Sequence, residues 1–143
     1  MATGFRPYSL PLVAGGCFLL FCNWLFFNAG SSWNLTKDKA TNIPQLSIMN
    51  TVLSAAGACT AYSIYTMGNE FYNAFPRRDG IKNLTLKYDP MAFIKVILVG
   101  CVAVTASCNN IDTMHAVIIG MIGACVYEFS VILLRKLEID DPL

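Results

Sequence analysis

The chain has 143 residues, enough for one domain, and a formal net charge of +1. Hydrophobic residues make up 55% of it and charged residues only 13%, against roughly 25% charged in typical soluble domains. This composition excludes an ordinary soluble domain, and the balanced charge gives no sign of nucleic-acid binding. We therefore predict an integral membrane protein.

Four apolar stretches predict an all-α membrane protein with four spanning helices. Each is close to the length of about 20 residues that crosses a bilayer. We expect a single membrane domain over residues 1–143, with the polar stretch 69–90 forming a loop outside the membrane. The last helix should be the one around which the others pack. The predicted helices cover about residues 10–27, 46–67, 91–109 and 114–134.

Small residues in the second and fourth helices predict close packing. Residues 54–61 read Ser-Ala-Ala-Gly-Ala-Cys-Thr-Ala. Such a stripe lets helix backbones approach closely in a bilayer, where packing drives association. We expect the stripe to be exposed and to meet partner chains. The candidates for helix packing or partner contact are Ser54, Ala55, Gly57, Ala58, Lys95, Gly120, Gly123 and Glu128.

Charged residues within the predicted helices have more than one interpretation. Lys95 lies about one turn into the third helix, where a lysine usually extends to the interface, and the alternative is a functional or partner-pairing lysine. Glu128, in the fourth helix, is interpreted as an ion-pair partner of another subunit, as part of a polar pocket, or as an interfacial residue near Arg135. His115, at the start of that helix, is interpreted as a surface histidine.

The distribution of cations predicts the orientation. With four spans, both termini and the 69–90 loop lie on one side of the membrane. That side carries most of the cations, which the positive-inside rule places in the cytoplasm, or in the matrix of a mitochondrion. The cations on that side are Arg6, Arg77, Arg78, Lys82, Lys87, Arg135 and Lys136, against Lys37 and Lys39 on the other.

No pattern in the chain indicates catalysis or a bound cofactor. There is no HExxH pair, no glycine-rich phosphate loop and no nucleophile beside a base. The cysteines lie in or beside apolar runs and no pair has CxxC spacing, which disfavours a disulfide framework or a zinc site. We predict no enzyme activity, no cofactor and no metal. The cysteines are Cys17, Cys22, Cys59, Cys101, Cys108 and Cys125.

Several stretches resemble the ammonium transporter family (Amt/Mep/Rh). The matches follow the family's order and spacing over nearly the whole chain, and the end, Ile-Asp-Asp-Pro-Leu, is the most specific of them. The chain departs from the family at Asn23 and Phe26, where glycine is usual, and at Lys95, where asparagine is usual. The family's sixth, seventh, eighth and ninth helices are resembled by residues 18–31, 50–58, 102–108 and 116–123, and the turn after the ninth by residues 137–143.

The resemblance implies a fold of two inverted five-helix repeats, of which this chain resembles the second without its last helix. The family's conduction path lies between the repeats and contains two histidines. One would precede this chain and the other would follow Leu143, so we expect neither here. Trp24 matches an aromatic position near the family's pore, but without the opposing repeat we expect it to line nothing. The family's topology also places both ends of this piece on the cytoplasmic side.

The absence of both pore histidines leads to our first hypothesis. It describes a non-catalytic, transporter-derived accessory subunit of a larger membrane complex, in a mitochondrial inner-membrane respiratory or ATP-synthase assembly. Its partners would be other membrane subunits and the lipid bilayer. The alternative is one chain of a split ammonium transporter, whose second chain supplies the histidines and which alone would bind ammonium. A third possibility is a fragment of a full transporter, against which the start at Met1 argues.

Overall fold

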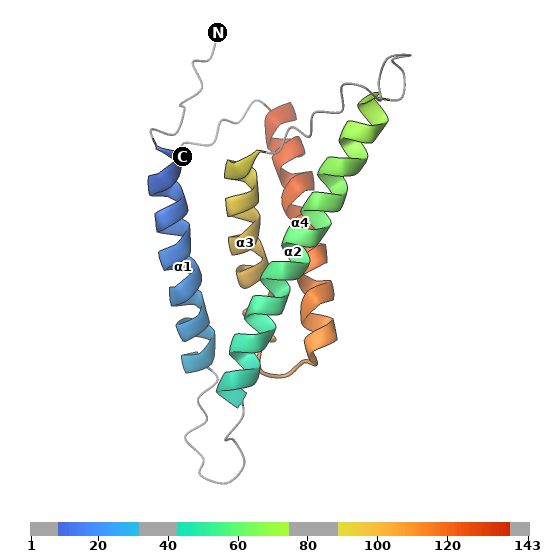
Figure 1. The fold of residues 1–143 in the computed structure, drawn as a ribbon. Coiled ribbons are helices and arrows are strands. Elements are labelled where there is room, and N and C mark those ends of the chain that lie inside the picture. The colour runs from blue at the N-terminus through green and yellow to red at the C-terminus, as the bar shows by residue number, and fades with distance from the viewer. Residues whose placement is uncertain (1–8, 32–42, 75–88, 138–143) are drawn as a thin grey trace.

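The computed structural model describes residues 9–31, 43–74 and 89–137, and every regular element in these residues is an α-helix. The helices form a bundle in which α2 crosses α4 diagonally (Figure 1). The prediction of an all-α protein with four helices is therefore confirmed. The helices are α1 (Leu10–Ser31), α2 (Ile43–Ala74), α3 (Pro90–Val104) and α4 (Thr113–Lys136).

The helix around which the others are arranged is α2, not α4. Among the described helices, α2 and α3 each pack against all three others and α2 has the more extensive contacts, whereas α4 packs against α2 and α3 alone. The expectation of a central α4 was wrong because hydrophobicity does not select the central helix. Bulky side chains such as Ile122 and Phe129 stand on the outside of α4 and are exposed. The middle of α2 instead carries small residues, which allow backbones to approach from several sides.

The helices begin and end at other residues than the apolar pattern predicts. α1 continues to Ser31, and α2 runs from Ile43 to Ala74. The first residues of the predicted 69–90 loop are therefore helical, and Pro90 is the first residue of α3. Residues 75–88 of that loop lie outside the described residues. An apolar window marks the part of a helix that suits the membrane, whereas the helix itself continues until a residue stops it.

The chain after α3 is bound by a side chain from α2. The prediction extends this helix to residue 109, but it ends at Val104 and the chain continues in turns. Asn50 Nδ2 donates to the carbonyl oxygens of Cys108 at 2.8 Å and of Ile111 at 2.9 Å. These bonds satisfy two carbonyl groups in the turn that connects α3 to α4. Where the last turns of α3 were predicted, the chain therefore has turns with their own backbone hydrogen bonds and a contact with α2.

The outside of the bundle is apolar, as expected for a chain surrounded by lipid. In α1 only Cys17 and Asn28 are buried within the described structure. Among the described helices, Leu10–Ser31 and Thr113–Leu134 are long and apolar enough to cross a membrane, and Pro90–Val104 is a shorter apolar helix. Exposed large apolar side chains include Leu12, Phe18, Leu19, Phe26 and Phe27 on α1, and Ile118, Ile122, Val126 and Phe129 on α4.

Candidate functional site

The small-residue stripe of α2 lies inside the bundle. Ser54 is completely buried, and its hydroxyl donates to the backbone oxygen of Gly100 on α3 at 2.7 Å. On the other side, Gly120 of α4 lies so close to the Ser54 carbonyl group that a Cβ atom there would overlap it. Ser54 thus joins α3 and α4 to α2. The expectation that this stripe is exposed was wrong for Ser54, Ala55 and Ala58, which are buried, and their contact with partner chains stays a prediction.

Other predicted packing residues lie at the same crossings. A Cβ atom at Gly57 would overlap the carbonyl oxygen of Val117 on α4. Gly123 faces α3, where a Cβ atom would come within 2.9 Å of Ala103 Cβ. Ala55 and Ala58 of α2 are buried as well. These residues hold helices of one chain together, because small side chains permit the short distances between backbones.

Trp24 is held against α3 by a hydrogen bond. Its Nε1 donates to Thr105 Oγ1 at 2.8 Å, and the threonine hydroxyl donates to the carbonyl oxygen of Cys101 at 2.9 Å. The centre of the Phe27 ring lies 6.1 Å from that of the indole. The aromatic position that the family resemblance singled out is therefore fixed by its own bundle.

Two buried asparagines form further polar contacts of the helices, and the sequence pattern pointed to neither of them. Asn28 Nδ2 donates to Thr51 Oγ1 at 2.9 Å, and Thr51 Oγ1 donates to the carbonyl oxygen of Ser47 at 2.7 Å. Asn28 and Asn50 are fully buried, and their Oδ1 atoms have no partner among the described residues. A signal was available, since asparagine in a spanning helix usually binds another helix.

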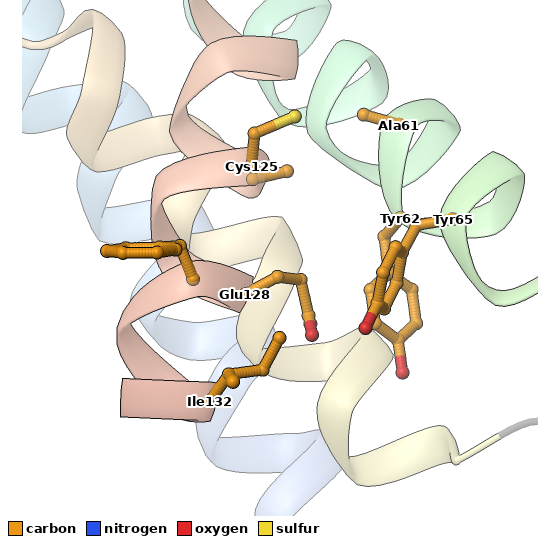
Figure 2. Close-up of a pocket in the computed structure, with 8 residues that line it drawn as sticks. Ala61, Tyr62, Tyr65, Cys125, Glu128 and Ile132 are labelled. Carbon is orange, nitrogen blue, oxygen red and sulfur yellow. The ribbon is translucent and has the colours of Figure 1, made fainter. Parts of the chain in front are cut away.

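The charged candidates do not take part in these hydrogen bonds. Lys95 is exposed on α3, and His115 is exposed in the first turn of α4, with its Nδ1 atom 3.9 Å from Asp112 Oδ2. Glu128 is half-buried and lines a groove between α2 and α4, together with Tyr62 and Tyr65 (Figure 2). Within the described parts of the chain, no three His, Cys, Asp or Glu side chains are placed to hold a metal ion.

Comparison with known proteins identifies relatives of the whole chain. A family model described as "Ammonium Transporter Family" matches residues 1–143. "Ammonium transporter 3" of Dictyostelium discoideum is 30% identical over 96% of this chain and 30% of the relative. "Ammonium transporter" of Mycobacterium tuberculosis (strain ATCC 25618 / H37Rv) is 29% identical over 99% of this chain and 26% of the relative. No solved structure matches the chain.

A third relative, "Putative ammonium transporter 1" of Caenorhabditis elegans, is 31% identical over 95% of this chain and 23% of the relative. The chain therefore spans less than a third of the length of each of these relatives. All three carry the name of a transporter. The similarity covers this chain almost from end to end but only part of each relative.

These matches correct the first functional hypothesis. A mitochondrial respiratory or ATP-synthase accessory subunit is contradicted by the family match and by the relatives' names, and the transporter alternative fits them better. The hypothesis gave too much weight to the absence of the family's two pore histidines from these residues and too little to the helices that the residues form. The family resemblance is confirmed, and with it the assignment as an integral membrane protein. This chain belongs to the ammonium transporter family.

Proposed function

We propose that these residues form part of a membrane transporter that conducts ammonium, completed by helices outside the 143 residues. The observation that carries the proposal is the family match over residues 1–143. The relatives are named as ammonium transporters, and the chain corresponds to less than a third of each. We therefore assign this chain a role in transport and no enzyme activity.

The packing of the bundle supports this role. The contacts of Ser54 with Gly100 and Gly120 hold α2, α3 and α4 close together, and the Trp24–Thr105 hydrogen bond attaches α1. Such a bundle presents one fixed wall to other helices of a transporter. We place both termini on the cytoplasmic side because the termini and the loop on that side carry more cations than the loop on the opposite side.

A chimaera tests whether these helices support conduction. The matching segment of the Dictyostelium relative is replaced by residues 1–143 and expressed in a host without ammonium transporters of its own. We expect uptake of labelled methylammonium, a permeant analogue of ammonium, above that of the empty host. The same chimaera with Gly120→Val is the control, because it should reach the membrane poorly and carry little.

One result of the chimaera experiment would contradict the proposed role in transport. A chimaera that reaches the cell surface in normal amount and yet takes up no methylammonium would contradict the proposal. A second chimaera, carrying the corresponding segment of the Caenorhabditis relative in the same place, controls for the grafting itself. Uptake by this second chimaera alone would show that the defect belongs to the present chain.

A further inference from the structure

The side chain of Asn50 extends from α2 to the turn between α3 and α4, at the end of the bundle where α2 begins (Figure 1). This side chain is fully buried. Both hydrogens of its amide nitrogen are used, one by the carbonyl oxygen of Cys108 at 2.8 Å and one by that of Ile111 at 2.9 Å. Its Oδ1 atom accepts no hydrogen bond from the described residues. The amide therefore donates twice and accepts nothing.

Turning the amide of Asn50 over does not satisfy this oxygen. The exchange of Oδ1 and Nδ2 would bring the oxygen against two carbonyl oxygens, which have no hydrogen to donate. Asn28 differs in this respect. Its partner is the hydroxyl of Thr51, which can donate as well as accept, so a turned amide would receive a hydrogen bond there. Of the two unpartnered asparagine oxygens in the described residues, that of Asn50 is therefore the one that requires a further donor.

The surroundings of this oxygen suit a small neutral donor. Cys108 belongs to a buried apolar cluster with Val104 and Ala116, in which a charge would be unfavourable. A metal cation would also need several oxygen ligands, and within the described parts of the chain no three His, Cys, Asp or Glu side chains are placed to hold one. A water molecule needs only roughly two to four polar partners, and it carries two hydrogens to donate.

The position of the turn in the membrane also favours water. α3 has 15 residues and is therefore about 22 Å long, whereas the hydrocarbon core of a bilayer is about 30 Å thick. Because the charged Asp89 caps the start of α3, the turn that follows the helix begins at membrane depth. Non-helical backbone at such a depth needs partners within the protein or ordered water. The exposed polar residues Asn109, Asn110 and Asp112 then lead the turn to the membrane surface, where water is at hand.

We propose that one ordered water molecule is bound here, and that it donates one hydrogen to Asn50 Oδ1 and the other to the carbonyl oxygen of Cys108 or Ile111. Each of these carbonyl oxygens has a second lone pair besides the one that accepts from the asparagine amide. The water completes the hydrogen bonding of the asparagine and strengthens the link between α2 and the turn that leads into α4. This inference does not require that the chain conducts ammonium.

Nuclear magnetic resonance tests for this water. The full chain, labelled with nitrogen-15, is dissolved in micelles of dodecylphosphocholine, a detergent without hydrogen-bond donors. The nuclear Overhauser effect between water protons and the amide protons of the Asn50 side chain is measured. Asn50→Leu identifies these amide signals by their loss. The matched control is Asn23→Leu, which removes an asparagine at an exposed position of α1 and should leave them in place.

We expect wild-type protein to show this effect at Asn50, with the sign that a long-lived bound water produces. The backbone amide of Val96 is the internal control, because this residue of α3 is fully buried and its amide lies within a regular helix. The effect at Val96 should be at least about tenfold weaker, since buried water binds where polar groups are otherwise unsatisfied.

Several results would overturn the proposal. The absence of the effect at Asn50 in wild-type protein would do so by itself, whether or not Asn50→Leu folds. An effect of the opposite sign would mean that water only passes by, and an equal effect at Val96 would mean that water enters the whole bundle. An effect seen in dodecyl maltoside but not in dodecylphosphocholine would show that a detergent hydroxyl is the donor instead. None of these results bears on methylammonium uptake by the chimaera.

Discussion

The two halves of α2 differ in how they meet the rest of the bundle. In the first half, Ser54, Ala55 and Ala58 are at most 5% exposed, and neighbouring backbones lie directly against them. In the second half, Met67 and Tyr72 are 59% and 77% exposed. Both halves belong to one continuous helix. Helix formation alone therefore does not decide which part of α2 is central.

Side-chain size explains the difference. Small residues permit the crossing of α2 with α4 near Gly57 and Gly120, where backbone atoms are in contact. Beyond this crossing, Ala61, Tyr62 and Tyr65 of α2 line a groove that opens between α2 and α4. Contact between backbones therefore gives way to larger side chains and a groove. Three substitutions in or against the first half of α2, and one between α1 and α3, test this comparison.

The largest effect is expected from Gly120→Val at the crossing. Its Cβ atom would overlap backbone atoms of Ser54, which cannot move without separating the helices. We expect the free energy of unfolding to fall by about 3 kcal/mol, as for severe overpacking. Denaturant titration in detergent micelles, followed by circular dichroism, measures it. Gly15→Val is the control because no atom lies within 4 Å of a Cβ there, and an equal loss in both variants would contradict the crossing.

Asn50→Leu should have the next largest effect. It removes the amide that binds the carbonyl oxygens of Cys108 and Ile111 and leaves them without this donor. We expect a loss of about 2 kcal/mol in the free energy of unfolding, since unsatisfied buried polar groups are unfavourable. The same titration measures it. Asn23→Leu, at an exposed position of α1, should change stability little; a similar loss there would show that asparagine matters for another reason.

Two serines allow the stability contribution of a hydrogen bond between helices to be compared with that of a hydrogen bond within one helix. Ser54 Oγ donates across to Gly100 at 2.7 Å, whereas Ser130 Oγ donates to Val126 of its own helix at 2.8 Å. Ser54→Ala should lower the free energy of unfolding by about 1 kcal/mol, and Ser130→Ala by less than about 0.5 kcal/mol. Unfolding of both variants in the same detergent gives the comparison. Equal losses would mean that the bond to α3 adds nothing.

The smallest effect is expected where α1 meets α3. Trp24→Phe removes the hydrogen bond to Thr105 but keeps an aromatic ring. A double-mutant cycle with Thr105→Val isolates this bond, and we expect a coupling free energy of about 0.6 kcal/mol, typical of hydrogen bonds between membrane helices. A coupling near zero would show that this hydrogen bond does not help to hold α1 against α3.

The sequence shows many of the residues that make up the candidate site, but it does not show which other residues lie against them in the fold. The stripe around Ser54 predicts close packing, yet a pattern along one helix does not name the helix that covers it. Glu128 is conspicuous as a charge in an apolar run, whereas its tyrosine neighbours come from another helix. Asn28 and Asn50 gave a weaker signal, because their partners lie 23 to 61 residues away.

The sequence by itself determined the membrane environment, the four helices and the family, because apolar length and local motifs depend on neighbouring residues alone. The tertiary structure decided that α2 is central, that α3 ends at Val104 and that Glu128 faces a groove. These features depend on which backbones come into contact. Such contacts are set by the size and hydrogen bonding of side chains far apart in the chain, such as Ser54 with Gly100 and Asn50 with Cys108.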